Sequence, residues 1–463
     1  MNFLSYQSLF FVSITLLIFI LSPSQYRTPV LLIASLIFYF YSQIFFILNI
    51  LIISTIVYSI CNYIIFQKNK NIKFIFFLIG IIIIFGNLIY YKTINSINGL
   101  IIPLGISYFS FKLASYIIDT YKGNYNKVSF IEFILYAIFF PQIICGPIHR
   151  PNDFFVKLKY IQENYKFSEN FEIAFRLILS GLFLKLIIGD RLNEFINVVS
   201  KADLNYSKEV IFLLTISYTL QMFADFAGYT NIVRGISKLF GIDSPINFNS
   251  PFLARNMIDF WRRWHISLSS WINDYLFSFL QIHFRYYGNL GIYFSLTLTM
   301  TLIGLWHGFT LNFLIFGLIH SFLLIITIYF QNKKFNYYLI NISRKFSYFY
   351  IFLGCIFTFL FMSFSLIFFR NNDISSSLKQ IQILLGIASP GILTYNDIRN
   401  DIIDPVYLCI LASYYYGIGM PGFQYFKNKI LIKIPNYLQY GGILFAISAL
   451  STESSMSFLY GQF

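Results

Sequence analysis

The sequence predicts an all-α polytopic membrane protein, and three observations support this fold class. Apolar residues make up 57% of the 463 residues, and charged residues only 11%, whereas a typical soluble domain carries about 25% charged residues. Several apolar runs approach or exceed the roughly 20 residues with which a helix crosses a bilayer. These runs are continuous, whereas the strands of a membrane barrel alternate apolar and polar residues, so the pattern favours helices.

Apolar runs along the chain give the candidate membrane spans. The first run has no basic region before it and no cleavage-site pattern, so we interpret it as a retained span. One further run, residues 128–145, ends in PQIICGPIHRP, whose prolines and glycine predict a broken or re-entrant element. Together the runs predict about 11–13 transmembrane or re-entrant helices in a single domain over residues 1–463. The candidate spans lie roughly at 6–22, 28–43, 44–66, 73–91, 103–121, 170–190, 209–227, 290–305, 310–330, 347–369, 405–420 and 437–451.

Lysine and arginine in the short loops predict the orientation of the chain. The longer loops 191–208 and 370–404, whose charges are mixed, are then outside. The assignment is consistent only if residues 128–145 do not cross, and it places both termini outside and residues 228–289 inside. The basic loops predicted to be cytoplasmic hold Lys68, Lys70 and Lys73, then Lys333, Lys334, Arg344 and Lys345, then Lys427, Lys429 and Lys433.

Charge and motifs exclude several classes of function. The net charge of +14 does not indicate a nucleic-acid partner, because the basic residues sit in short loops between apolar runs. The chain shows no metal-ligand spacing, no P-loop and no GxSxG motif, so its motifs give no support to a hydrolase or an ATP-driven pump. The four cysteines stand singly in or beside apolar runs, and we interpret them as small apolar side chains: Cys61, Cys145, Cys355 and Cys409.

Residues 245–275 form the most polar long stretch of the chain. Read as a helix from about Arg255 to Tyr275, this stretch has two separate faces. It is either an interfacial helix whose basic residues face lipid headgroups or the wall of a functional site. The apolar face holds Met257, Phe260, Trp264, Leu268, Trp271 and Tyr275, and the polar face holds Arg255, Asp259, Arg262, Ser269 and Asn273, with His265 at its edge.

Among the five histidines, His307 is the strongest candidate for chemistry. It lies in GLWHGFTLNF between two apolar runs, and an ionisable group at membrane depth is costly, so a function is the default hypothesis. Gly304 and Gly308 flank it and would let another backbone or a ligand approach closely. A histidine in a site of low dielectric suits general-base work on a hydroxyl or thiol. The structural alternative is a hydrogen bond to a neighbouring helix.

The remaining polar candidates carry weaker signals. His320 lies in an apolar helix and is interpreted as structural, and His283 as interfacial, whereas His149 could be either structural or functional. Asp225 lies near the end of a span in QMFADFAGYTNI. It could orient a histidine or pair with an arginine, but an ordinary carboxylate at a helix end is an equally good interpretation.

FWRRWHISLSSWINDYL, together with GLWHG, resembles the motifs of the membrane-bound O-acyltransferases, specifically the bacterial branch of alginate and peptidoglycan O-acetylation proteins. The resemblance covers most of residues 100–320. Two departures, QIHFRYYGNL in place of a Gly-Gly-Asn-Arg-like turn and ADFAGYT in place of FDFSGYS, leave the subgroup and the acceptor open. The other matching motifs follow in the same order: PLGISYFSFKLASYIIDTYKG (103–123), FPQIICGPIHRPNDF (140–154) and QMFADFAGYTNIVRGISKLFGIDSPINFNSPFLARN (221–256).

The resemblance implies a fold, a donor and a partner. The fold would be a bundle of helices around a central tunnel, in the inner membrane of a bacterium. The acyl donor would be cytoplasmic acetyl-CoA, with no permanently bound cofactor and no metal. A separate extracytoplasmic acetyltransferase of the SGNH type would deliver the acetyl group to a cell-envelope polysaccharide, and membrane lipids would surround the bundle.

The resemblance also assigns the residues of the site. The near-invariant histidine of the family maps to His307, which would act as general base. The second conserved polar position maps to His265, which would assist. Guanidinium groups suit the phosphates of the donor. The predicted donor-binding residues are Arg262, Arg263, Trp261 and Ser267.

The end of the chain adds a further match. The family, or its small partner in the D-alanyl system, often ends in an aromatic motif whose tyrosine can accept the acyl group. The chain ends in SFLYGQF, and Tyr460 occupies the matching position, although Gly461 stands where an aromatic residue is more usual. The tail 452–463 is therefore predicted to be an acyl-carrier motif, with Tyr460 as a catalytic residue.

Our hypothesis is O-acetylation, with peptidoglycan as the first choice of acceptor and an alginate-like or capsular glycan as the second. D-alanyl transfer from a carrier protein to teichoic acid shares every structural expectation. A transporter or flippase of a lipid-linked glycan fits the hydrophobicity equally well. The concentration of His, Arg and Trp in residues 255–275 and the absence of inverted repeats argue against a transporter.

Overall fold

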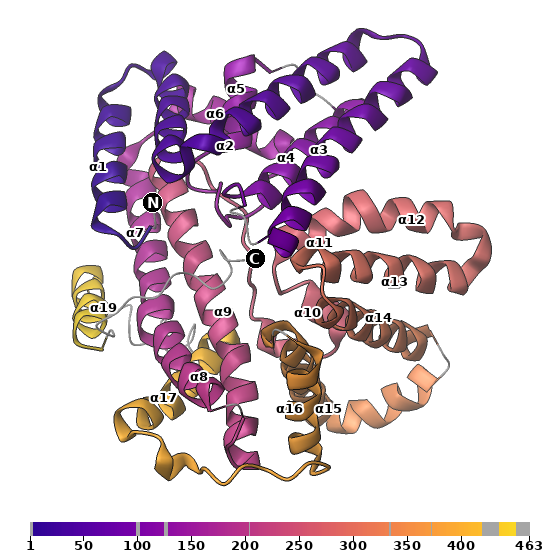
Figure 1. The fold of residues 1–463 in the computed structure, drawn as a ribbon. Coiled ribbons are helices and arrows are strands. Elements are labelled where there is room, and N and C mark those ends of the chain that lie inside the picture. Colours follow the sequence, from indigo (N-terminus) through magenta and orange to yellow (C-terminus); the bar gives the residue numbers. More distant parts are fainter. Residues whose placement is uncertain are drawn as a thin grey trace. The chain divides into compact units, whose positions relative to one another are not determined.

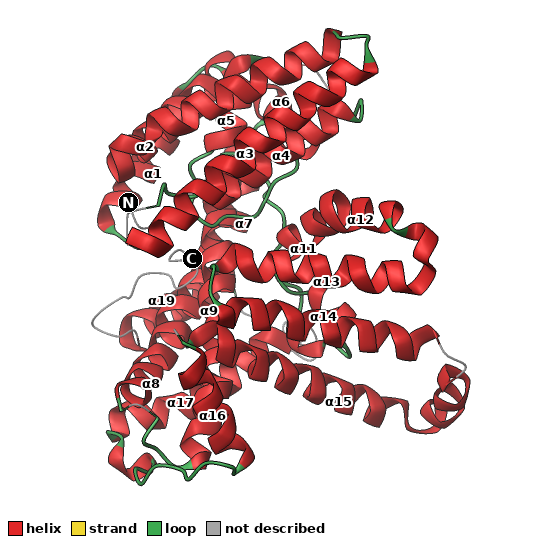
Figure 2. Ribbon diagram, turned by 45° about the vertical axis from the view of Figure 1, so that its right-hand side comes forward, coloured by secondary structure: helices red, strands yellow, loops and turns green. Residues whose placement is uncertain are grey.

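The computed structural model describes residues 3–98, 102–124, 128–202, 204–332, 335–371, 373–418 and 435–450. Nearly all of these residues lie in helices, and none lies in a strand of a sheet (Figure 1, Figure 2). Within these ranges, six helices are long and apolar enough to cross a membrane. The predicted fold class, an all-α polytopic membrane protein, is confirmed. The six candidate spans are Ser24–Phe66, Lys70–Ile94, Lys208–Leu239, Arg285–His307, Leu311–Gln331 and Phe349–Arg370.

The helices form two compact units. One unit holds Met1–Gly181 and Tyr229–Ile246, and the other holds Leu182–Gly228 and Asn247–Phe463. Helix α9 (Lys208–Leu239) contributes residues to both. Up to α7 the order is α1 (Tyr6–Leu21), η1 (Ser24–Tyr26), α2 (Arg27–Phe66), α3 (Lys70–Asn98), α4 (Ile106–Tyr121), α5 (Phe130–Ile138), α6 (Pro151–Asn164) and α7 (Phe167–Leu182). The remaining elements are η2 (Phe183–Gly189), α8 (Asp190–Lys201), η3 (Pro251–Leu253), α10 (Met257–Trp261), α11 (Ile266–Ile272), η4 (Asn273–Phe277), α12 (Ser278–His283), η5 (Arg285–Tyr287), α13 (Gly288–His307), α14 (Leu311–Asn332), α15 (Phe335–Arg370), α16 (Ile374–Leu385), η6 (Tyr395–Asp397), α17 (Asn400–Ile418) and α19 (Asn436–Leu450).

Helix α2 changes direction at Gln43, whose backbone leaves the helical region (φ −156°, ψ 80°). Its side-chain amide donates to the carbonyl oxygen of Ile102 at 3.2 Å and accepts from the backbone N–H of Leu104 at 2.6 Å. These two bonds tie the break in α2 to the segment that precedes α4. The predicted boundary between the runs 28–43 and 44–66 therefore falls at a real break.

The predicted span 170–190 lies in a helical stretch that runs without a break from α7 through η2 into α8. Two other predicted spans correspond to α1 and α4, which have only 16 residues each. At 1.5 Å per residue such a helix is about 24 Å long, shorter than the roughly 30 Å hydrocarbon layer. Helix α4 shows why hydropathy predicted a span here. Nearly all its residues are buried, so its apolar side chains are explained by packing within the protein.

The run 128–145 is broken, as predicted. Helix α5 begins at a capping box between Ser129 and Glu132 and ends at Ile138 after nine residues. Pro141 lies just beyond the end, and a proline cannot continue a helix because it has no N–H group. The chain then turns so tightly that a Cβ on Gly146 would clash with the backbone of Gln142, which explains the glycine at that position.

His149 belongs to a buried polar network in the first unit. The Lys112 amine donates to Gln142 Oε1 at 2.9 Å, which directs Gln142 Nε2 toward His149 Nδ1 at 3.0 Å and Ser244 Oγ at 2.7 Å. Nδ1 of His149 therefore accepts, so Nε2 carries the proton and donates it to Asp153 Oδ2 at 2.7 Å. This network favours the structural interpretation of His149, which the sequence left open.

We expect His149 to make the protein sensitive to acid. Burial is the main reason why the pKa of His149 is lowered from 6.5 to about 4; the positive charges of Lys157 and Lys112 act in the same direction, and Asp153 opposes them through its hydrogen bond and its charge. Between these two pH values the unfolded chain binds a proton that the folded chain does not. The free energy of unfolding should therefore fall as the pH drops from 6.5 to 4, by about 3 kcal/mol in total.

The measurement is thermal unfolding of the purified protein at pH 4 to 8, for the wild type and for His149→Gln, whose side chain does not titrate. The wild type should lose stability below pH 6.5 more steeply than the variant does. The pKa of Asp153 is lowered to about 2, chiefly by its hydrogen bond with His149, so its own titration falls below this window. Parallel pH profiles for the two proteins would show that His149 is not the acid-sensitive group.

Candidate active site

The polar stretch around His265 is two short helices and not one long helix. Helix α10 ends at Trp261 and α11 begins at Ile266. Between them the backbone bonds to residues 247–249: the Asn249 N–H donates to the Arg263 carbonyl, and the Ile266 N–H to the Asn247 carbonyl, each at 2.9 Å. The prediction of a continuous helix from Arg255 to Tyr275 is therefore wrong, because the partners of these backbone groups come from another segment of the chain.

His265 sits at this break in the left-handed backbone conformation, with φ +45°. Non-glycine residues adopt it uncommonly, so it signals a local constraint. The side chain is only 1% exposed, and its ring meets the ring of Phe226 on α9 edge-on, with centroids 4.7 Å apart. Burial lowers the pKa of His265 to about 3, so its imidazole is neutral at pH 7. His265, which was predicted at the edge of the polar face of one long helix, is buried at the break between two short helices.

The predicted donor-binding residues have different surroundings. Arg262 is exposed, and no ion pair involves it in the described part of the chain. Arg263 is held by Asp259, with 2.8 Å between Nε and Oδ1, and it also donates to the Asn249 carbonyl. Trp261 is partly buried, and Ser267 is buried with its N–H bonded to Asn247 Oδ1. Of the four, Arg262 is thus the one best placed to present charge to a ligand.

His307 is the last residue of α13, and its side chain is only 8% exposed. Four aromatic rings surround it, from its own helix, from α14 and from α15. The closest are Trp306 and Phe369, with centroid distances of 4.5 and 4.8 Å, and Phe313 and Phe316 follow at 6.0 and 6.3 Å. This aromatic enclosure excludes water, and electrostatic interactions with a reacting group are strong in such a place.

Glycines bring α13 and α14 into close backbone contact just before His307. A Cβ on Gly304 would clash with the carbonyl oxygen of Phe313, and a Cβ on Gly317 would clash with that of Met300. The sequence left open whether Gly304 admits a backbone or a ligand, and the structure shows a backbone. Gly308 faces the ring of Phe313. This hairpin fixes the end of α13 and hence the place of His307.

His265 and His307 belong to the same unit, and aromatic rings connect their surroundings. Phe316 contacts both His307 and His320, with centroids 6.3 and 4.4 Å apart, and His320 in turn contacts Trp261 at 5.3 Å. Trp261 lies on α10, just before the break that holds His265. The surroundings of the two histidines therefore join in one aromatic cluster.

The two other histidines of this unit fit their predicted roles. His320 is fully buried and hydrogen-bonds to Ser365 on α15, with 3.0 Å between Nε2 and Oγ. This agrees with the structural interpretation. His283 is exposed at the end of α12, next to Phe279 and Phe284, as suits an interfacial residue.

Asp225 forms a buried ion triad with two residues that the sequence reasoning missed. Its Oδ1 lies 2.5 Å from the amine of Lys185, and the same amine lies 2.9 Å from Asp190 Oδ1. All three side chains are at most 2% exposed. Asp225 precedes Phe226, the ring that packs on His265, so the triad ties this part of α9 to the π-helical turn η2 and to α8. A lysine within the apolar run FLKLIIGD was the signal that could have revealed it.

Tyr460 and the tail 452–463 lie outside the described residues. The candidate site therefore rests on His307 and His265, the arginines at the break between α10 and α11, and the triad around Lys185.

Comparison with known proteins extends the resemblance seen in the motifs. A family model described as MBOAT, the membrane-bound O-acyltransferase family, matches residues 16–364. A peptidoglycan O-acetyltransferase of Helicobacter pylori is 27% identical over 65% of this chain and 60% of its own length. A teichoic acid D-alanyltransferase of Streptococcus thermophilus is 32% identical over 49% of this chain and 55% of its own length. A probable alginate O-acetylase of Pseudomonas aeruginosa is 31% identical over 64% of this chain and 59% of its own length. The matched regions thus span less than two thirds of these relatives.

Proposed function

The chain belongs to the membrane-bound O-acyltransferase family, and on this premise we propose that it is a membrane O-acetyltransferase of the bacterial cell envelope. The acetyl group would come from cytoplasmic acetyl-CoA and would reach a cell-envelope polysaccharide. The observation that carries the proposal is the place of His307, buried among four aromatic rings at the end of a membrane-crossing helix. Peptidoglycan is the first choice of acceptor, and an alginate-like or capsular glycan is the second.

His307 acts as general base in the proposed reaction. Its imidazole removes the proton of the acceptor hydroxyl as the hydroxyl oxygen attacks the thioester carbonyl of acetyl-CoA. The new C–O ester bond forms, the C–S bond breaks, and the proton passes from His307 to the departing thiolate of CoA. Burial keeps the imidazole of His265 neutral. In this state His265 assists by orienting the wall of the site next to the donor.

Arg262 is assigned to the phosphates of acetyl-CoA, with Arg263 as a positioning residue. We expect Arg262→Gln to raise the KM for acetyl-CoA roughly 5- to 10-fold with little change in kcat, because one charge-assisted hydrogen bond is lost. Arg263→Gln is the matched control. Its partner is Asp259, so it should change this KM less than about 3-fold. Equal effects of both variants on KM would contradict the assignment.

Tyr460 is proposed to carry the acyl group between donor and acceptor. Tyr460→Phe keeps the ring and removes the nucleophilic oxygen, so transfer to polysaccharide should fall to background if the relay exists. Mass spectrometry of the wild-type protein incubated with acetyl-CoA should then find an acetyl adduct on Tyr460. Full activity of Tyr460→Phe would eliminate the relay and leave direct transfer to a partner.

The partner in this proposal is an extracytoplasmic acetyltransferase of the SGNH type, and the location is the inner membrane of a bacterium with both chain termini outside. The proposal rests on the family and on the pattern of basic loops. A neighbouring gene for a secreted SGNH-type acetyltransferase would favour it, whereas a gene for a carrier-protein ligase would favour D-alanylation.

D-alanyl transfer is the second candidate, because a teichoic acid D-alanyltransferase is 32% identical to nearly half of the chain. The two candidates differ in the donor. Membranes containing the protein should transfer label from acetyl-CoA to the envelope and should not transfer it from a D-alanyl carrier protein. The reverse result would replace the proposed function by D-alanylation.

A further inference from the structure

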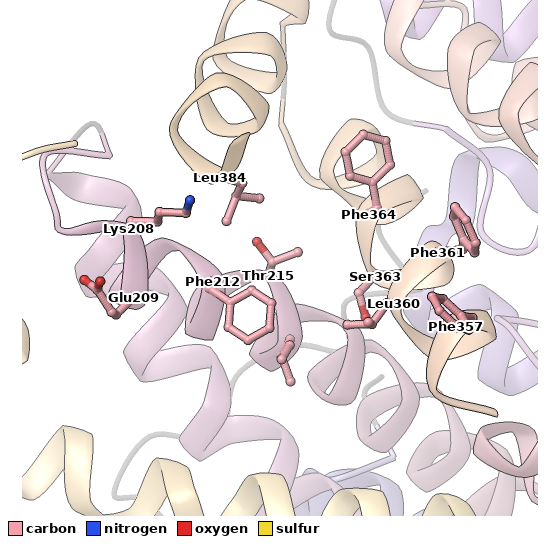
Figure 3. Close-up of a pocket in the computed structure, with 11 residues that line it drawn as sticks. Lys208, Glu209, Phe212, Thr215, Phe357, Leu360, Phe361, Ser363, Phe364 and Leu384 are labelled. Atoms are coloured by element: carbon pink, nitrogen blue, oxygen red, sulfur yellow. The ribbon is translucent and has the colours of Figure 1, made fainter. Parts of the chain in front are cut away.

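The second unit holds an open pocket of about 610 Å³ between α9, α15 and α16 (Figure 3). This volume lies in the range of roughly 300–1,000 Å³ that is typical of ligand sites. The mouth is formed by large apolar side chains that are each between 36% and 56% exposed. They are Phe212 on α9 and Phe357, Leu360, Phe361 and Phe364 on α15.

The apolar mouth of the pocket lies on two helices that could cross a membrane. Both α9 and α15 contain a stretch long and apolar enough to cross a membrane, and the exposed phenylalanines lie on those stretches. Two residues with hydroxyl groups, Thr215 and Ser363, also line the pocket, but their hydroxyls are engaged by the protein. Thr215 donates to the Ile211 carbonyl and accepts from Gln380, and Ser363 donates to the Phe359 carbonyl. The inner wall therefore offers no open hydrogen-bonding group and suits a hydrocarbon chain.

Two charged residues, Lys208 and Glu209, line one end of the pocket. Lys208 opens α9, and its amine is close to the end of α16, where a Cβ on Gly386 would lie 3.7 Å away. No ion pair of Lys208 is found among the described residues. Figure 3 shows the amine turned toward Leu384, whereas the carboxylate of Glu209 points away from the pocket. The cation is thus available to an anion that enters this end.

We propose that the pocket binds an acyl chain of a membrane phospholipid whose anionic headgroup lies against Lys208. Lysine side chains at the ends of membrane helices reach for the headgroup layer, so Lys208 and the apolar mouth match the two parts of one lipid molecule. Seven residues separate Lys208 from Thr215 on the same helix, which is about 10 Å along the axis. The headgroup and the chain would therefore be held at different depths.

The test is native mass spectrometry of the purified, delipidated full-length protein, titrated with phosphatidylglycerol or with phosphatidylcholine of the same acyl chains. We expect the first phosphatidylglycerol to bind about 5-fold more tightly than the first phosphatidylcholine, which is the gain expected from one lysine beside an anionic headgroup. Lys208→Gln should remove this preference without weakening the binding of phosphatidylcholine. Leu360→Trp, which fills the mouth, should weaken the binding of both lipids.

Two matched variants control for general effects. Lys201→Gln removes an exposed lysine at the end of α8, and Leu302→Trp enlarges an exposed leucine on α13, and neither residue lines the pocket. Both should bind lipid as the wild type does. An unchanged preference for phosphatidylglycerol in Lys208→Gln would overturn the role of Lys208. Equal binding by Leu360→Trp and Leu302→Trp would overturn the pocket itself. Because Lys208 lies at the start of its helix, Lys208→Gln should fold even if Leu360→Trp does not. The lipid preference can then still be tested with Lys208→Gln.

Discussion

His307→Ala should lower acetylation of the cell-envelope polysaccharide about 10²- to 10⁴-fold, the usual contribution of a general base. His307 is the one histidine that combines the end of a candidate membrane helix with an aromatic enclosure on several sides. Without the imidazole, the acceptor hydroxyl would have to attack the thioester while it still holds its proton. The measurement is the ester-linked acetate released from purified envelope by mild base, for cells carrying the wild-type or variant gene.

Two further variants make this result interpretable. His307→Gln keeps most of the side-chain volume, so it separates loss of the base from loss of packing against Phe369. His283→Ala removes an exposed histidine at the end of α12 and should leave acetylation unchanged. The amount of each variant in the membrane is compared by immunoblot. Wild-type acetylation by a normally inserted His307→Ala protein would remove His307 from the proposed mechanism.

Lys185→Met should cause the largest loss of stability, about 3–5 kcal/mol in the free energy of unfolding. The substitution leaves Asp190 and Asp225 as two carboxylates in a buried site, with no cation between them. The surrounding backbone is a π-helical turn, and such turns are rare and often lie at functional sites. Because Phe226 packs on His265, a displaced Asp225 should also disturb the site.

Thermal unfolding in detergent, followed by intrinsic fluorescence, measures this effect. Lys201→Met, at the exposed end of α8, is the matched control and should melt like the wild type. Adding Asp190→Asn and Asp225→Asn to Lys185→Met removes both unpaired charges and should recover part of the lost stability. If Lys185→Met alone melts at the wild-type temperature, then the triad does not hold this part of the fold.

Hydropathy predicted much of the architecture, because apolar runs and the polar residues that interrupt them can be recognised within short segments of the sequence. The break at Gln43 coincides with a polar residue in an apolar run, and the end of α13 at His307 coincides with a glycine. Hydropathy did not separate α4 from a membrane span, because a helix buried in protein and a helix in lipid have the same composition. The partners that hold α4, such as Gln142 for Lys112, come from other parts of the chain.

The candidate site was predicted only in part. His307 stands out in the sequence because a titratable side chain at membrane depth is rare. The environment of His265 was predicted wrongly. The helical pattern holds for a few residues on each side of His265, but the backbone between the two short helices pairs with residues 247–249. Such pairing is a tertiary contact, which a helical wheel of a single segment cannot show. Lys185 was overlooked although its local signal resembles that of His307.

The most direct test of the central claim is the release of free CoA by the purified protein in liposomes supplied with acetyl-CoA, an SGNH-type acetyltransferase and a peptidoglycan preparation. The wild-type protein should release CoA continuously only when acetyl-CoA, the partner and the acceptor are all present, and without the acceptor it should release at most the single CoA per protein that acetylation of Tyr460 sets free. The His307→Ala protein, shown to be folded by its unfolding temperature, should release it about 10²- to 10⁴-fold more slowly. CoA release at the wild-type rate by the folded His307→Ala protein would contradict the account.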